Sequence, residues 1–149
     1  LHSTSRRQRQ MCIRDRIHSV VVATVDETGH PHTAVMDMMW EDGKTVYFLT
    51  ADFKPLYKRL KEDGRVAVTG MTQGAGTMDR KSISLTGQVE WIGKEHLEEL
   101  LKANPYMYEI YPTEEGRSHL QVFRFKNSVG NFYDLTQLPP YQARFEIEG

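Results

Sequence analysis

The sequence has one cysteine, no long apolar run and almost no net charge. Cys12 alone excludes an internal disulfide and a cysteine-based metal cluster. No stretch is apolar and long enough to predict a transmembrane helix, and no basic start followed by an apolar region predicts a signal peptide. A net charge of −1 over 149 residues argues against binding to nucleic acid or a membrane surface through bulk charge. We therefore expect a cytoplasmic protein without nucleic-acid or membrane partners.

The first sixteen residues differ from the rest of the chain. They read LHSTSRRQRQMCIRDR, which is rich in arginine and has no apolar period. A basic arm for nucleic acid is one interpretation. The interpretation that we favour is an extraneous or disordered leader, residues 1–16, outside the fold. We then expect one folded domain over residues 17–138 and an irregular tail over residues 139–149, which begins with two prolines.

Short segments rich in β-branched and aromatic residues predict a mainly β protein. The expected strands are residues 17–26, 30–40, 45–50, 65–70, 81–92, 120–126 and 130–135, and glycine-containing turns join the first three. The last two are expected to form a hairpin around the sequence NSVG. Leucine spacing predicts helices at residues 55–62 and 94–104. So few helices cannot cover both faces of a parallel sheet, so we expect a small antiparallel barrel.

The sharpest local signal is the stretch TADFKPLY, which follows a predicted strand. Proline is favoured at the first helical position, and the residue before it is extended, so Lys54 is expected to cap a helix that begins at Pro55. The backbone N–H groups of Leu56 and Tyr57 would then point back toward Thr50 at the strand end. A lysine beside a helix N-terminus predicts an anion site. The alternative is a solvated lysine at a helix start.

Two histidines stand two residues apart on a predicted strand. His30 and His32 could form a two-ligand arm of a metal site, but no third ligand is evident. We favour exposed histidines at a strand edge.

Two further patterns have a structural and a functional interpretation. The methionines at 36, 38 and 39 are typical of soft core packing, or of a flat apolar wall for an aromatic ring. The strand at 81–92 has one polar face, which either meets water or lines a ligand groove. Read alone, each pattern favours the structural interpretation.

The order of these motifs resembles that of the pyridoxamine 5′-phosphate oxidase-like family, the FMN-binding split β-barrels. The matching motifs are PHTAV at 31–35, FLT at 48–50, KPLYKRL at 54–60, VAV at 66–68 and SISLTGQVE at 82–90. The resemblance covers about residues 19–92, and the remainder more loosely. It implies a mainly β (α+β) fold: a six- to seven-stranded antiparallel split β-barrel with two or three short helices. It also implies a homodimer with FMN at the subunit interface.

The resemblance implies cofactor contacts from three parts of the chain. The residues expected to bind FMN are His32, Thr33, Ala34 and Val35 along the ring, Leu49, Thr50 and Ala51 at a strand end, Lys54 on the phosphate, and Lys81, Ser82 and Ser84. The implied activity is that of a flavin-dependent oxidoreductase acting on a small molecule. No catalytic residue is assigned, although His32 is a candidate proton donor.

Two departures separate this chain from true pyridoxamine 5′-phosphate oxidases. The basic residue that those enzymes carry at the end of the second strand is here Asp37 or Met38, and their C-terminal arginine–histidine pair has no match. We therefore expect a general flavin-dependent reductase. The alternatives are a split barrel that binds a deazaflavin or haem, and a non-enzymatic flavin-binding module.

Overall fold

The computed structural model describes residues 17–73 and 76–148, and the expected leader lies outside these ranges. The described residues form one antiparallel eight-stranded sheet. Its strands are β1 (Ser19–Val25), β2 (Pro31–Asp37), β3 (Trp40–Glu41), β4 (Val46–Ala51), β5 (Arg65–Met71), β6 (Lys81–Gly93), β7 (Leu120–Asp134) and β8 (Tyr141–Ile147). The helices are α2 (Pro55–Glu62), α3 (Leu97–Ala103), α4 (Met107–Ile110) and α5 (Glu114–Arg117), with a 3₁₀ turn η1 (Thr77–Asp79). The predicted split barrel is confirmed, with eight strands and four short α-helices in the described residues.

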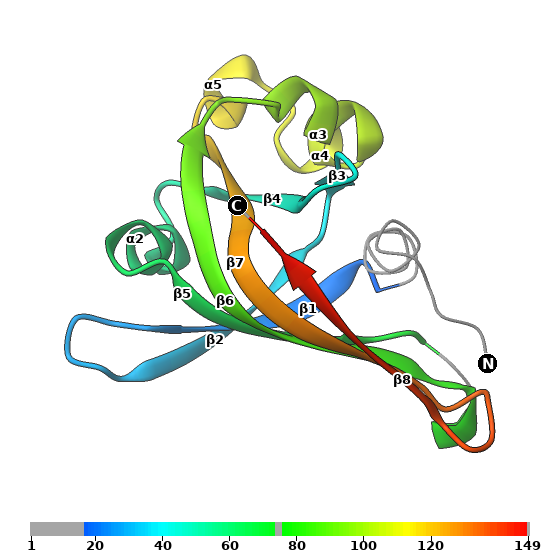
Figure 1. Cartoon of the computed structure of the whole chain (residues 1–149). Helices are drawn as coiled ribbons and strands as arrows, with labels where there is room; N and C mark the ends of the chain where they lie inside the picture. The colour runs from blue at the N-terminus through cyan, green and yellow to red at the C-terminus, as the bar shows by residue number, and fades with distance from the viewer. Residues whose placement is uncertain (1–16, 74–75, 149) are drawn as a thin grey trace.

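The sheet is organised around the long strand β7. The strand order is β2-β1-β5-β6-β7-β4-β3, and β8 also pairs with β7. β4 pairs with the first part of β7, Leu120 to Arg124, and β8 pairs with its second part, Ser128 to Asp134. β6 runs along the other edge of β7, and Figure 1 shows the two as a long curved pair. The sheet therefore divides along β7, and the β4 part carries the helices α3 to α5.

Two predictions at the C-terminal end were wrong. The expected hairpin around NSVG is a single continuous strand, β7, and the expected irregular tail contains β8. Asn127 has a φ of 47°, and the pairing of β6 with β7 shifts register between Thr86 and Gln88. The turn-forming residues are thus absorbed as an irregularity inside a strand that is paired on both sides. Pro139 and Pro140 lie in the connection before β8.

β4 is buried on both of its faces. Val46 and Phe48 belong to the core inside the barrel, whereas Tyr47, Leu49 and Ala51 belong to a second cluster with Leu100, Leu101 and Met107. A strand covered on both sides reads as a continuous apolar run, which explains the sequence VYFLTA. The helices α3 and α4 therefore pack on the outer face of β4, as Figure 1 shows at the top of the molecule.

Helix α2 follows the prediction closely. Lys54 is its extended N-cap, with φ −88° and ψ 144°, and proline occupies the first turn. Leu56 and Leu60 are buried, and Gly64 follows the helix with a φ of 78° that favours glycine. The buried leucines fix the helix against the barrel, so the chain at Lys54 has a defined position. No helix in the described part of the chain is long and apolar enough to cross a membrane.

Gly87 is required where β6 crosses β7. A Cβ at this position would lie 2.5 Å from the Cα of Ser128, so the two backbones approach too closely for a side chain. We expect Gly87→Ala to lower the free energy of unfolding by roughly 1–3 kcal/mol, because the strands must separate. Urea denaturation measures the change. Gly76→Ala is the matched control, since a Cβ there meets nothing within 4 Å. Equal stability of the two variants would show that position 87 does not require glycine.

Candidate active site

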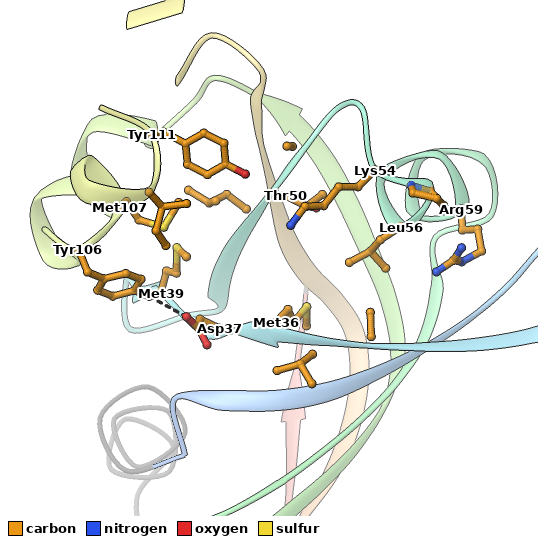
Figure 2. A pocket seen from close by; sticks show the side chains of 16 residues that line it. Met36, Asp37, Met39, Thr50, Lys54, Leu56, Arg59, Tyr106, Met107 and Tyr111 are labelled. Atoms are coloured by element: carbon orange, nitrogen blue, oxygen red, sulfur yellow. Dashed lines mark hydrogen bonds between the residues drawn. The ribbon is translucent and has the colours of Figure 1, made fainter. Parts of the chain in front are cut away.

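A cavity of about 530 Å³ lies between β2, β4, α2 and the segment around α4. Figure 2 shows it from close by, with Lys54 and Arg59 on one side and Asp37 and Tyr106 on the other. The lining residues, in chain order, are Ala34, Val35, Met36, Asp37, Met39, Leu49, Thr50, Ala51, Lys54, Pro55, Leu56, Arg59, Tyr106, Met107, Ile110 and Tyr111. Its volume falls within the usual range for a small-molecule site, roughly 300–1,000 Å³.

One end of the cavity carries positive charge. The Lys54 backbone N–H donates to the Ala51 carbonyl at 3.1 Å, which closes the turn between β4 and α2 and brings Lys54 back beside Thr50. Arg59 lies on the same helix, and its Nε donates to the Thr24 hydroxyl at 2.7 Å. This bond holds the half-buried guanidinium in the cavity wall. Lys54 and Arg59 therefore both line the part of the cavity beside α2.

The helix N-terminus offers fewer backbone donors than the sequence predicted. The Tyr57 N–H donates to the Lys54 carbonyl at 3.1 Å, so it is occupied within the first turn of α2. Positive charge at this end consequently comes mainly from the side chains of Lys54 and Arg59 rather than from backbone groups.

The opposite end of the cavity carries a carboxylate. The Tyr106 hydroxyl donates to Asp37 Oδ2 at 2.8 Å, and the Ser19 hydroxyl donates to Asp37 Oδ1 at 2.7 Å. Burial and the neighbouring Asp37 raise the pKa of Tyr106 above its usual value, so its phenol stays protonated as a donor. The two ends of the cavity thus differ in the sign of their charge.

Apolar side chains line the space between the two ends. Met36 and Met39 contribute from the end of β2 and the residues after it, Leu49 from β4, and Met107 from α4. The α4 segment is fixed by the buried Asn104, whose Nδ2 donates at 2.8 Å to the Met39 carbonyl and at 2.8 Å to the Leu100 carbonyl. The middle of the cavity is therefore suited to a flat or apolar group.

The structure brings six of the eleven predicted site residues into this cavity. They are Ala34, Val35, Leu49, Thr50, Ala51 and Lys54. The methionines at 36 and 39 were interpreted either as core packing or as an apolar wall of a site. Each of them is buried and each also lines the cavity, so both interpretations apply.

The other five predicted site residues lie outside the cavity. His32 is at the start of β2, where its Nε2 is 2.8 Å from Asp26 Oδ2, and Thr33 follows it. Hydrogen bonds from Thr28, His32 and His30 hold the pKa of Asp26 well below its usual range, so this turn is a local polar cluster.

The remaining three residues lie at the start of β6, next to β5 and the end of β7. Ser82 and Ser84 pair there with residues of both strands, and Lys81 pairs with Asp134 of β7. Lys81 Nζ is 4.0 Å from Asp134 and lines a second hollow together with His18, Ser19 and Met71. Within one chain these residues do not meet Lys54.

Sequence reasoning missed the charged and aromatic residues that complete the cavity. Arg59 lies one helical turn and a half after Lys54, but a basic residue in an amphipathic helix ordinarily indicates a solvated face. Tyr106, Met107 and Tyr111 come from a segment with no clear period, so no local signal pointed to them. In the described residues no group of three or more histidine, cysteine, aspartate or glutamate side chains could hold a metal ion, so the histidine-arm interpretation has no support.

The chain matches one protein-family model. The sequence model described as pyridoxamine 5′-phosphate oxidase matches residues 8–133, which is most of the chain. The chain belongs to the pyridoxamine 5′-phosphate oxidase family. A search of curated proteins found no match to the sequence.

Solved structures of this family's fold are similar at low sequence identity. A NimC/NimA family protein from Clostridium acetobutylicum has a TM-score of 0.76 at 20% identity, over 94% of this chain and 91% of that one. A haem-binding protein from Mycobacterium smegmatis has a TM-score of 0.71 at 14% identity, and the match spans 98% of this chain but 60% of that one. An F420 reductase has a TM-score of 0.59 at 19% identity, over 77% of this chain and 90% of that one. At these identities the likeness establishes the fold.

Asn104 anchors the cavity wall, and its removal should loosen it. We expect Asn104→Ala to lower the free energy of unfolding by roughly 1–3 kcal/mol, because the Met39 carbonyl loses its buried donor. Urea denaturation measures the change, and limited proteolysis near α4 reports the loosening. The control is Asn131→Ala at an exposed position of β7, which should shift stability by less than about 0.5 kcal/mol. A stable, protease-resistant Asn104→Ala protein would disprove the anchoring role.

Proposed function

We propose that this cavity binds FMN and that the chain is a flavin-dependent oxidoreductase for a small-molecule substrate. The observation that carries the proposal is the pair of cations, Lys54 and Arg59, at one end of a mainly apolar cavity. FMN has the complementary form, since it joins a phosphate to an apolar, flat ring system. Membership of the pyridoxamine 5′-phosphate oxidase family supports the same cofactor.

The residues present fit such a cofactor. Lys54 and Arg59 would hold the phosphate, with the Thr50 hydroxyl at the strand end between the charges and the apolar middle. The methionines at 36, 39 and 107 and Leu49 would enclose the ring. When bound, FMN would supply hydride and electron transfer, while the protein binds, orients and shields it.

A general reductase is better supported than pyridoxamine 5′-phosphate oxidase activity. Asp37, at the end of β2, places a carboxylate where the resemblance to true oxidases implies a basic residue for a substrate phosphate. A carboxylate there would repel that phosphate. We therefore propose that the substrate is a different small molecule.

The similar structures of an F420 reductase and a haem-binding protein suggest two other cofactors. A deazaflavin has the same phosphate and ring pattern as FMN, and the cavity would accept both. For haem, the cavity lining among the described residues contains no histidine or cysteine, which leaves methionine or tyrosine as axial ligands. The cavity therefore favours a flavin or a deazaflavin over haem.

We also propose that the protein is a homodimer with cofactor at the subunit interface. Val21 and Val35 face each other across β1 and β2, and both are exposed, Val35 to 73%. Adjacent exposed apolar side chains are typical of an interface. A second copy would also supply a route by which Lys81, Ser82 and Ser84 approach the cavity, which one chain alone does not provide.

The cofactor assignment predicts that Lys54 is needed for flavin affinity. The purified protein should show a flavin absorbance spectrum, or take up added FMN with quenching of flavin fluorescence. Lys54→Met should raise the dissociation constant of FMN about tenfold or more, because a charge-assisted hydrogen bond to phosphate is lost. Fluorescence titration measures the constant.

Lys58→Met is the matched control for this titration. Lys58 is exposed on the same helix but does not line the cavity, so its removal should leave FMN affinity unchanged. A protein that stays colourless and fails to quench FMN would refute the proposal. A Soret band in the spectrum would favour haem, and the mass of acid-released cofactor separates FMN from a deazaflavin.

The dimer proposal predicts a solution mass of twice the 17.3 kDa of the chain. Val21→Arg should convert the dimer to a monomer, because a charge would be buried in the apolar contact. Light scattering after gel filtration measures the mass. Leu138→Arg, at an exposed position before β8, should leave the dimer intact. A monomeric unmodified protein at micromolar concentration would overturn the proposal.

A further inference from the structure

The Asp37 end of the cavity is built as a cluster of hydrogen bonds on one carboxylate. Besides the hydroxyls of Ser19 and Tyr106, His18 lies close, with its Nε2 2.8 Å from the Tyr106 oxygen and 3.4 Å from Asp37 Oδ2. The single phenolic proton of Tyr106 goes to Asp37, so His18 Nε2 must carry the proton of the bond to Tyr106. The two donors to the carboxylate arrive from the start of β1 and from the N-cap of α4, which fixes the carboxylate in one orientation, while His18 holds the Tyr106 hydroxyl.

This carboxylate retains capacity to bind a ligand. An ionised carboxylate has about four acceptor positions on its two oxygens. Its hydrogen bonds to the two hydroxyls, one on each oxygen, use two of these positions. The Asp37 side chain is 27% exposed and lines the cavity. A donor inside the cavity can therefore reach an acceptor that is already held in place.

The charged residues of the lining are divided between the two ends. In the described chain they are Asp37 at one end and Lys54 and Arg59 at the other, with Met36 between them in Figure 2. A ligand group at the Asp37 end meets a negative charge in a partly water-excluded place, where an anion would be repelled and a cation attracted. The cavity thus selects for charge at this end.

We propose that Asp37 binds a positively charged, hydrogen-bond-donating group of the substrate, such as a protonated amine or an amidinium. The substrate is then a cationic molecule with an apolar or aromatic body, and anions of the same shape, such as phosphate monoesters and carboxylates, are rejected. Tyr106 and His18 act as positioning residues that hold the carboxylate. This inference rests on the proposed function, since it assigns the substrate end of the same cavity.

The alternative role of Asp37 is purely structural, because its hydrogen bonds also tie β1, β2 and α4 together. The two roles differ in what they require. A structural tie needs an acceptor of the right size, which asparagine partly supplies, whereas selection for a cation needs the negative charge. A series of ligands matched in shape but not in charge therefore separates them.

The test is calorimetric titration with benzylammonium, benzyl alcohol and phenyl phosphate, on protein loaded with FMN and on protein without it. In the FMN-loaded protein, benzylammonium should bind about tenfold more tightly than benzyl alcohol, and phenyl phosphate should bind more weakly than either. Asp37→Asn should remove the preference for the cation, and Asp37→Lys should reverse it. Glu109→Gln, an exposed change on α4 outside the cavity lining, should leave the preference intact.

The outcomes separate this inference from the FMN proposal. Equal affinity of unmodified protein for benzylammonium and benzyl alcohol overturns the inference and needs no variant to interpret. A preference that persists in folded Asp37→Asn also overturns it. If FMN fails to bind but the free protein prefers benzylammonium in an Asp37-dependent manner, the cofactor proposal falls and the cation site stands. If FMN binds but the protein shows no preference among the ligands, the cofactor proposal stands and the cation site falls.

Discussion

The burial of β4 on both faces is the constraint on which the cavity depends. One face of the strand closes the barrel core and the other supports α3 and α4, so the strand cannot shift without disturbing two apolar clusters. Its end at Thr50 and Ala51 is consequently fixed, and the turn to Lys54 starts from a rigid point. Helix α2 is held in turn by its own buried leucines. The packing of β4, together with that of α2, therefore determines the position of the positive end of the cavity.

The negative end is built differently. It depends on polar contacts between segments far apart in the sequence, in which Asp37 of β2 receives hydrogen bonds from Ser19 and Tyr106. Such a network fixes direction as well as distance, because each donor must point at a lone pair. The cavity is thus held by apolar packing at one end and by hydrogen bonding at the other. This difference means that its two ends respond to different kinds of substitution.

The sequence was sufficient for the parts of the fold that local chemistry determines. Pro55 sets the start of α2 and the following leucines set its buried face. β-Branched residues indicate β1, and alternation indicates most of β6. Long-range pairing was beyond local patterns: β7 continues through NSVG because β6 and β8 pair with it on both sides, and no turn propensity reports that. The resemblance to a family predicted that the residues at the end of β4, near Lys54, belong to the site. The order of motifs along the chain was enough for that prediction.

The Lys54 end of the candidate site could be predicted from the sequence, whereas the Asp37 end could not. Lys54 and Thr50 are close in sequence, so local reasoning placed them together. Tyr106 approaches Asp37 from 69 residues away, and the contact exists only once α3 and α4 have packed on β4. His32 lies outside the cavity of this chain, at the start of β2, where its Nε2 contacts Asp26 in the preceding turn. Its predicted contact with the cofactor stays a prediction.

The segment from Asn104 to Tyr111 forms one wall of the cavity, yet it contributes no strand to the sheet. Its named polar links to the barrel are Asn104 to the Met39 carbonyl and Tyr106 to Asp37 and His18. Mutations that change the other side chains of this wall alter the cavity without touching barrel hydrogen bonds. Substitutions at the exposed positions of this short stretch can therefore change which ligand the cavity accepts while the hydrogen bonds of the barrel stay intact.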